Sequence, residues 1–213
     1  NDTHRYRLIL TGIVVNWSLS MRSQRIARLP PRERVLDAAH ELFFNEGISR
    51  VTVDAIAAKA ETTKMTVYRH FESKDTLVLS WLQLLMEEYD AVWAELAERF
   101  AGQPARQILG FAEFLVQEPV LSSHRGCAYT NTLAELPVCD SPARTLIEAH
   151  KRRQANRLVR LCEESGLEEP QMAAFELTLL LEGVQIVAQN KGFDDVASNL
   201  LTLVRKRLGL APN

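Results

Sequence analysis

Residues 52–71, TVDAIAAKAETTKMTVYRHF, constrain the possible fold more than any other stretch of this chain. Threonines precede two short runs with helical spacing, at Thr52 and at Thr62 and Thr63. A hydroxyl in that position can accept an otherwise unpaired backbone N–H of the first helical turn. Only Ala60-Glu61-Thr62 separates the two runs, which is about the length that a helix-turn-helix connection allows. The pattern therefore predicts two short helices joined by a tight turn.

The two predicted helices each have an apolar side and a polar side. The positions expected to point inward are Ile56, Ala57, Ala60, Val67 and Phe71. The outward side of the second helix carries hydroxyls and cations but no acid: Thr63, Lys64, Thr66, Tyr68, Arg69 and His70. Such side chains suit phosphate oxygens and base edges. The stretch therefore indicates a DNA-recognition unit.

The charge of the chain is unevenly distributed. Its formal net charge of −2 argues, taken alone, against a nucleic-acid binder. Residues 1–80 hold 12 Lys and Arg against 9 Asp and Glu, a net of +3, whereas residues 81–213 hold 13 against 18, a net of −5. A mildly basic first part and an acidic remainder fit a protein that contacts DNA at one end only.

The rest of the chain also has the periodicity of helices. Apolar residues recur at three- and four-residue spacing, and proline or glycine interrupts the runs. The predicted helices cover residues 32–45, 74–100, 104–115, 127–136, 142–164, 170–189 and 196–208. No alternating pattern typical of a strand occurs. We therefore expect an all-α fold of about nine helices, with a three-helix helix-turn-helix head, a long connecting helix and a domain boundary near Trp81.

The helix expected from Pro170 is apolar on both of its flanks. A helix of this kind is buried on two sides, which here indicates a core on one side and another subunit on the other. We therefore expect a homodimer formed through residues 170–208.

Residues 1–21 read differently from the remainder. The apolar run from Leu8 to Val15 is broken by Thr11 and Gly12 and is far shorter than the roughly 18 residues that a membrane-spanning helix needs. We expect a leader or disordered tail here, no membrane segment and a cytoplasmic protein. The three cysteines, Cys127, Cys139 and Cys162, lack metal-ligand spacing. Ordinary buried or pocket-lining thiols are favoured over a redox switch, and no metal or cofactor is expected.

Residues 32–80 resemble the N-terminal domain of the TetR family of bacterial repressors. The resemblance rests on LDAAHELFFNEG, on VTVDAIAAKA and on TTKMTVYRHFESKDTL, in which Tyr68, His70, Phe71, Ser73 and Lys74 follow the order of the family. The C-terminal part is similar only in its helix count and in the segment RGCAYTNTLAEL. The resemblance implies a DNA-binding domain at residues 22–80 and an effector-binding and dimerisation domain at residues 81–213. It also implies a double-stranded, palindromic operator and a small-molecule effector.

Glu61 departs from the family pattern, which usually has glycine at this position of the turn. Glycine is favoured there because the turn needs a positive φ, which costs other residues roughly 1–2 kcal/mol. Glu61 also brings a negative charge near the expected DNA face. Either the turn is slightly altered or the strain is accepted, and we expect weaker non-specific DNA binding. Glu61→Gly should therefore raise thermal stability and operator affinity together.

The candidate DNA-binding residues are Thr52, Thr62, Thr63, Lys64, Met65, Thr66, Tyr68, Arg69, His70 and Lys74. Lys64 and Lys74 are favoured for phosphate or base-edge contacts, and Thr62, Met65 and Thr66 for the choice of sequence. The candidate effector pocket consists of polar or aromatic residues on otherwise apolar helices: Trp81, Tyr89, Phe111, Phe114, Cys127, Asn131, His150, Phe175 and Gln185. For each of these residues taken alone, ordinary core packing is favoured over a role in the pocket.

The sequence favours a transcriptional repressor that an effector releases from its operator. A first alternative is an effector-less regulator, or one that responds to oxidation of Cys127. A second is a helical small-molecule-binding protein or enzyme that has lost DNA binding, which only Glu61 supports. We expect no enzyme, because no acid pair, Ser-His-Asp set or phosphate-binding glycine loop is visible.

Overall fold

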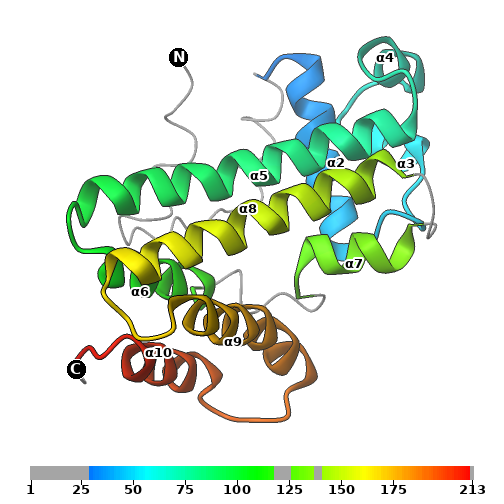
Figure 1. The fold of residues 1–213 in the computed structure, drawn as a ribbon. Coiled ribbons are helices and arrows are strands. Elements are labelled where there is room, and N and C mark those ends of the chain that lie inside the picture. Colours follow the sequence, from blue (N-terminus) through cyan, green and yellow to red (C-terminus); the bar gives the residue numbers. More distant parts are fainter. Residues whose placement is uncertain (1–28, 118–125, 137–140, 212–213) are drawn as a thin grey trace. The chain divides into compact units, whose positions relative to one another are not determined.

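The computed structural model describes residues 29–117, 126–136 and 141–211. Within these ranges the chain forms nine α-helices and no strand, so the predicted all-α fold is confirmed (Figure 1). The helices are α2 (Pro31–Glu46), α3 (Val53–Lys59), α4 (Lys64–His70), α5 (Lys74–Arg99), α6 (Pro104–Leu115), α7 (Ala128–Glu135), α8 (Pro142–Glu164), α9 (Pro170–Asn190) and α10 (Val196–Arg207). The leader or tail expected at residues 1–21 and the thiol of Cys139 lie outside the described residues.

The chain divides into two compact units, and it passes from one to the other inside helices. The first unit comprises Asn1–Glu88 and Thr132–Arg144, and the second comprises Tyr89–Asn131 and Thr145–Asn213. The first crossing falls within α5, which is one uninterrupted helix of 26 residues (Figure 1). Trp81, where we expected the second domain to begin, lies in the first unit.

Helices α2, α3 and α4 pack together as the predicted three-helix head. Helix α2 starts at Pro31, whose fixed φ suits the first turn of a helix. Its buried residues Val35 and Phe43 meet Ile56 of α3 and Val67 of α4 in a common core, and each of these side chains is at most 2% exposed. Complete burial of a side chain such as Ile56 stabilises the folded state by about 1.5–3 kcal/mol relative to leaving it exposed. Apolar burial therefore fixes the two short helices, which would not be stable alone.

Helix α5 begins in the head and is capped there. Ser73 Oγ accepts the backbone N–H of Thr76 at 3.1 Å. Trp81 is 1% exposed, packs edge-on against Phe43 at 5.2 Å between ring centroids, and donates its indole N–H to His40 Nδ1 at 3.3 Å. The start of α5 is thus part of the core of the first unit.

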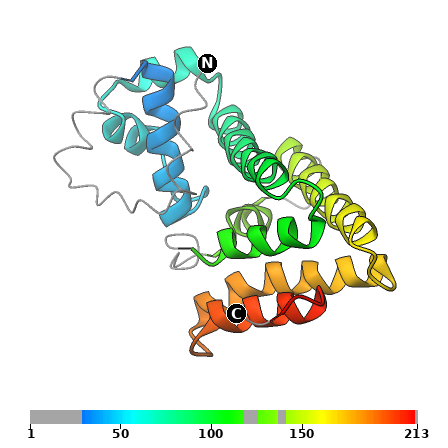
Figure 2. The same cartoon turned by 90° about the vertical axis from the view of Figure 1, so that its left-hand side faces the viewer.

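In the second unit, α10 packs against both α9 and α6. Helices α9 and α10 lie side by side in both ribbon views (Figures 1 and 2). Leu177 of α9, Val204 of α10 and Ile108 of α6 are each fully buried. This unit also contains the end of α5 from Tyr89 onward and α8 from Thr145 onward, whose buried side chains include Trp93 and Ile147.

Candidate functional site

Helices α3 and α4 form a helix-turn-helix whose two N-termini are capped by threonine hydroxyls. Thr52 Oγ1 accepts the N–H of Ala55 and Thr63 Oγ1 accepts that of Thr66, both at 3.1 Å. Each bond satisfies one of the N–H groups that a helix start leaves unpaired. The caps predicted from the sequence at Thr52 and Thr63 are therefore confirmed.

The turn between the two helices closes α3 with Glu61 in a left-handed conformation. Glu61 has a φ of 49°. Its N–H donates to the carbonyl of Ala58 at 3.1 Å, and the N–H of Thr62 donates to that of Ala57 at 2.9 Å. These two bonds make a Schellman motif, in which glycine usually takes the left-handed position. Of the two alternatives that the sequence left open at Glu61, an altered turn or an accepted strain, the structure has the second.

The side of α4 that faces away from the core presents several of the candidate DNA contacts. Val67 is buried, whereas Met65 is 82% exposed and Tyr68 is 45% exposed. Arg69 is also exposed, and Thr66 is half-buried with its hydroxyl 3.0 Å from that of Thr63. An exposed methionine with hydroxyl and cationic neighbours is a surface that can contact both bases and phosphates.

Lys64, at the start of α4, forms an ion pair inside the head. Its ammonium group donates to Asp54 Oδ2 at 2.8 Å, although both side chains are more than half exposed. The hydrogen bond to Asp54, and then the charge of that carboxylate, raise the pKa of Lys64. A phosphate that binds Lys64 must therefore compete with Asp54.

The remaining DNA candidates differ in their accessibility. Lys74, the first residue of α5, is half-buried, as is Thr62 in the turn. His70 ends α4, and its buried Nε2 has no hydrogen-bond partner among the described residues. The structure thus places all ten candidates in the capped turn, in α4 or at the two adjacent helix starts.

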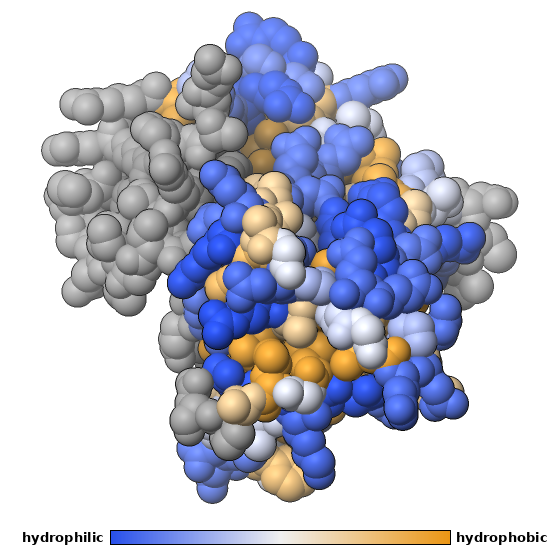
Figure 3. Space-filling model, turned by 60° about the vertical axis from the view of Figure 1, so that its left-hand side comes forward, coloured by the Kyte–Doolittle hydropathy of each residue, from blue (hydrophilic) through white to orange (hydrophobic). Residues whose placement is uncertain are grey.

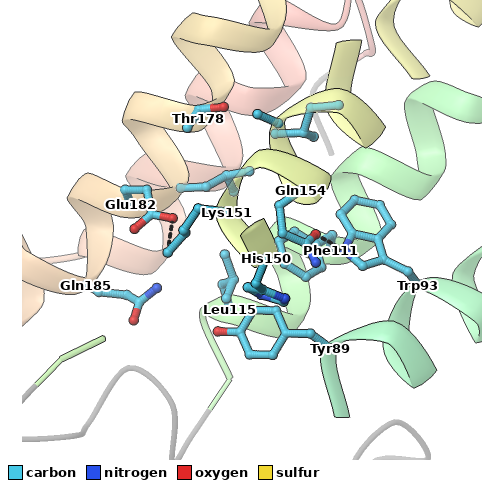
Figure 4. Close-up of a pocket in the computed structure, with 13 residues that line it drawn as sticks. Tyr89, Trp93, Phe111, Leu115, His150, Lys151, Gln154, Thr178, Glu182 and Gln185 are labelled. Atoms are coloured by element: carbon cyan, nitrogen blue, oxygen red, sulfur yellow. Dashed lines mark hydrogen bonds and ion pairs between the residues drawn. The ribbon is translucent and has the colours of Figure 1, made fainter. Parts of the chain in front are cut away.

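The second unit contains a cavity of about 190 Å³ between four helices (Figure 4). Residues of α5, α6, α8 and α9 line it: Tyr89, Trp93, Phe111, Leu115, His150, Lys151, Gln154, Ala155, Leu158, Thr178, Leu181, Glu182 and Gln185. Figure 4 shows the aromatic rings of α5 and α6 on one side and the polar residues of α9 on the other, with residues of α8 between them.

The aromatic side of the cavity is built from packed rings. Trp93 and Phe111 are stacked, with 4.2 Å between ring centroids and an interplanar angle of 19°. Tyr89 meets Phe111 edge-on at 5.8 Å and His150 edge-on at the same distance. These offset and edge-on arrangements are the ones that aromatic quadrupoles favour, so the rings form a well-ordered wall.

Two polar atoms of α8 at this cavity are buried and have no hydrogen-bond partner within the described ranges. His150 is 1% exposed, and its Nδ1 has no hydrogen-bond partner among the described residues. Burial, and then the charges of Lys151 and Arg153, lower the pKa of His150 to about 4, so the ring is neutral at pH 7. Gln154 Oε1 accepts the indole N–H of Trp93 at 2.8 Å, whereas the buried Gln154 Nε2 also has no partner in the described part of the chain.

The charged groups at the cavity are paired with one another. Lys151 forms an ion pair with Glu182, and Arg157 forms one with Asp90 at 3.0 Å. The ammonium group of Lys151 also lies 3.9 Å from the sulfur of Cys127, which is buried. Among the described residues, no group of three or more His, Cys, Asp or Glu side chains is placed to hold a metal ion.

Apolar side chains of α9 and α10 remain exposed on the outside of the second unit. Met172, Phe175, Leu179 and Ile186 lie three, four and seven residues apart, which places them on one face of α9, and each is about half exposed. Leu203 of α10 is 48% exposed. We call these five residues the α9/α10 apolar face. Figure 3 shows apolar residues gathered in the lower part of the view, which is where α9 and α10 lie in Figure 1.

Comparison with known proteins identifies the head. Residues 35–80 match the family described as bacterial regulatory proteins of the tetR family. A TetR-family transcriptional regulator from Streptomyces coelicolor is 27% identical, with a TM-score of 0.74 over 84% of this chain and 94% of that one. Residues 35–80 therefore match the N-terminal part of this family, and the chain as a whole is similar to TetR-family regulators.

Other relatives cover less of the chain or are less similar. The transcriptional repressor DhaR of Mycobacterium sp. strain GP1 is 26% identical over 120 residues, which are 56% of this chain and 59% of that protein. The chain spans about half the length of the curated relatives it matches. A regulator from Saccharomonospora viridis, solved with choline, has a TM-score of 0.72 over 84% of this chain and 95% of that one. It is 18% identical and shows the TetR fold alone.

The structure brings together four of the nine candidate pocket residues, Tyr89, Phe111, His150 and Gln185. Phe114 contacts Tyr89 and Phe111 behind the lining, and Cys127 approaches Lys151. Asn131 is half-buried in α7 and does not line the cavity. Trp81 lies in the core of the first unit, and Phe175 is 57% exposed on the α9/α10 apolar face.

Sequence reasoning missed several lining residues, chiefly Trp93, Lys151, Gln154 and Glu182. Trp93 was assigned only to the apolar pattern of α5. The other three look like the ordinary solvated residues of amphipathic helices, although the i, i+4 spacing of His150 and Gln154 on one helix face was a usable signal.

Proposed function

We propose that this TetR-family chain is a DNA-binding transcriptional regulator, and specifically a repressor that a small molecule releases from a palindromic operator. The observation that carries the proposal is the capped α3–α4 pair, whose second helix buries Val67 and exposes Met65, Tyr68 and Arg69. Residues 22–80 form the DNA-binding domain in this proposal and residues 81–213 the effector and dimerisation domain. As such a regulator, the protein is not an enzyme and acts in the cytoplasm.

The ten candidate residues divide into two roles. Met65, Thr62 and Thr66 read base edges, with the Met65 side chain against a thymine methyl group. The others position the head on phosphates: Thr52, Thr63, Lys64, Tyr68, Arg69, His70 and Lys74. The N–H groups at the starts of α4 and α5 support phosphate binding as well, because helix N-termini attract anions.

A homodimer through α9 and α10 is the second part of the proposal. The α9/α10 apolar face gathers five half-exposed apolar side chains, and exposed apolar patches often mark protein–protein contacts. The opposite flank of α9 is already buried in its own unit. By length and composition, α9 is also the one helix among the described residues that can cross a membrane. A soluble helix that is buried on both flanks meets the same criterion, and we prefer that explanation because the buried flank belongs to a helical core.

The cavity is the proposed effector site, and α5 is the proposed route to the head. Trp81 of α5 packs in the core of the first unit, and Tyr89 and Trp93 of the same helix line the cavity. A ligand that favours one position of these rings therefore favours one position of α5. Release follows if that position misplaces the two recognition helices relative to half-sites about 34–36 Å apart.

One observation favours a second candidate, in which oxidation of Cys127 replaces a bound effector. Its sulfur lies 3.9 Å from the ammonium group of Lys151, at the edge of the cavity that the proposed effector would occupy. Alkylation of Cys127 with iodoacetamide separates the two candidates. Loss of operator binding after alkylation supports the redox candidate, and unchanged binding removes it.

A gel-shift titration with the DNA upstream of the chain's own gene tests the proposal. A regulator forms a sequence-selective complex whose affinity falls steeply between 50 and 200 mM salt, by about a thousandfold or more if six or more phosphates are contacted. If no selective, salt-sensitive complex forms with the folded protein, DNA binding is excluded. The remaining candidate is then a helical ligand-binding protein.

A further inference from the structure

We propose that the cavity of the second unit binds an uncharged aromatic molecule, about the size of a substituted benzene, that carries a hydroxyl or carbonyl oxygen. This inference rests on the proposed effector site and deepens it by naming the chemical class of the ligand. It is carried by the size of the cavity, its aromatic wall, its two unpartnered polar groups and its paired charges.

The size of the cavity limits the ligand to about one aromatic ring with small substituents. A cavity of about 150 Å³ lined by apolar side chains is large enough for benzene, and this cavity has about 190 Å³. The difference leaves room for one or two further heavy atoms. Larger polycyclic molecules require the lining to move.

The lining of the cavity favours an aromatic molecule. Trp93 and Phe111 stack on each other, with 4.2 Å between ring centroids, and Leu115, Leu158 and Leu181 complete the apolar lining. No ring fits between the stacked pair, so a ligand ring meets the parts of these rings that line the cavity. Aromatic rings favour such offset and edge-on contacts, which a branched aliphatic molecule of equal volume cannot make.

The first polar anchor is Gln154. The indole N–H of Trp93 can only donate, so the amide atom 2.8 Å from it must be the oxygen of Gln154. The amide nitrogen is therefore a buried donor without an acceptor in the described part of the chain. Such a group costs about 1–3 kcal/mol while it is unsatisfied, and a ligand oxygen that accepts its N–H removes this cost.

The second anchor is His150, one helical turn before Gln154 on the same face of α8. Its Nδ1 is buried and unpartnered among the described residues, and its ring is neutral at pH 7. A neutral imidazole nitrogen donates or accepts according to its tautomer. One ligand hydroxyl can therefore accept from Gln154 Nε2 and donate to His150 Nδ1, and a carbonyl oxygen can accept from both.

The charges argue against an ionic ligand. Lys151 and Arg157 are already paired with Glu182 and Asp90, so an anion must break an existing ion pair. A cation finds the Trp93 ring already covered, because the guanidinium of Arg157 lies 5.3 Å from its centre and Phe111 stacks on it. The surroundings of His150 also disfavour positive charge, as its lowered pKa shows.

The test is direct binding of small probes to the protein without DNA, measured by calorimetry and by tryptophan fluorescence. The four probes are 4-methylphenol, toluene of nearly the same shape without the oxygen, benzoate as the anion and choline as the cation. We expect 4-methylphenol to bind about tenfold more tightly than toluene, since one net hydrogen bond of about 1.4 kcal/mol gives a factor of ten. Benzoate and choline are expected to bind more weakly than either.

Two variants locate the anchors. Gln154→Leu and His150→Phe are each expected to reduce the affinity for 4-methylphenol to near that for toluene and to leave toluene binding unchanged. Gln83→Leu is the matched control, because Gln83 is exposed on α5 in the first unit, and it should change neither affinity. Thermal melting shows whether each variant folds. If a variant does not fold, the inference is tested by the relative affinities of the four probes for the unmodified protein.

Three results overturn the inference: equal affinities for 4-methylphenol and toluene, tighter binding of choline or benzoate, or no saturable binding of any probe. A gel shift on the same preparation separates this outcome from the proposed function. Operator binding without 4-methylphenol binding refutes the ligand class alone. The expected probe pattern without any operator complex refutes the regulator and leaves the ligand class standing.

Discussion

Glu61 holds a backbone conformation that glycine adopts with little strain. It is the C′ residue of α3, with a φ of 49°, and its carboxylate lies next to the proposed DNA face. The left-handed conformation costs a non-glycine residue about 1–2 kcal/mol, and the greater freedom of glycine in the unfolded chain offsets about 0.5–1 kcal/mol of that. Compared with glycine at this position, Glu61 therefore lowers the free energy of unfolding by only a small amount.

Replacing this residue separates strain from charge. Glu61→Gly should raise the melting temperature by about 2 °C, given 2–4 °C per kcal/mol for a chain of this size, and should also raise operator affinity. The control Glu61→Ala removes the charge but keeps the strain, so it should raise operator affinity alone. Scanning calorimetry and gel shifts measure the two effects. Unchanged values for Glu61→Gly contradict both expectations.

His150 makes the stability of the protein depend on acid pH. Its pKa of about 4 in the folded protein is lower than the ordinary value of 6.5, so the unfolded chain binds a proton more readily in this range. Stability attributable to His150 is therefore complete above pH 6.5 and is lost as the pH falls towards 4. The loss amounts to at most about 3 kcal/mol.

Urea unfolding at pH 7 and at pH 4.5 measures this dependence. The control is His150→Phe, which cannot be protonated, and it should lose less stability than the unmodified protein over the same interval. Other groups titrate equally in both proteins, so the difference between them isolates His150. Identical pH dependences in the two proteins show that His150 is not buried as a neutral ring.

At the scale of elements, α9 has one flank buried in its own unit and the other exposed. Leu179, 57% exposed, lies in the middle of the α9/α10 apolar face. If two copies pair through this face, Leu179→Glu places two carboxylates in an apolar interface, where an unpaired charge is costly. We expect this variant to sediment as a monomer at concentrations where the unmodified protein is a dimer.

The control for this prediction is Met65→Glu, which adds the same charge at an exposed position of α4. Its sedimentation should match that of the unmodified protein. A Leu179→Glu variant that remains dimeric places the interface elsewhere.

The helix-turn-helix was predictable because its signals are local. The caps at Thr52 and Thr63 and the inward positions Ile56 and Val67 depend on neighbours within a few residues. The unusual residue at position 61 could also be recognised from the sequence, because a residue other than glycine is uncommon in a left-handed turn conformation. The helical character of these two segments and the residues at which they begin and end follow from the same short-range patterns.

The cavity was only partly predictable because it is assembled from four helices. Gln154 and Lys151 acquire their roles from Trp93 and Glu182, which lie 61 and 31 residues away in the sequence. Trp81 and Phe175 have the same chemical character as true lining residues, but the packing of α5 and α9 directs them elsewhere. Long-range packing, which helical periodicity does not encode, made this difference.

At the scale of the whole molecule, a dimer must engage both operator half-sites at once. Inserting about five base pairs between the half-sites turns one of them to the opposite side of the duplex. We expect affinity to fall to that of a single half-site, measured by gel shift. The control replaces the same central bases without changing their number, and it should retain binding. Equal affinity for the inserted and original operators shows that each head binds independently.

The ion pair between Lys64 and Asp54 gives the head an internal counterion. A free lysine that reaches a phosphate adds about 0.9 to the slope of log affinity against log salt, because an ion leaves the DNA. Lys64 must first leave Asp54, and the vacated carboxylate can then take up a cation from solution, which offsets that release. Operator binding is therefore expected to be less sensitive to ionic strength than the number of basic residues on the head suggests. The number of small cations bound to protein and DNA together then stays the same at this contact, because Asp54 replaces Lys64 with a cation from solution.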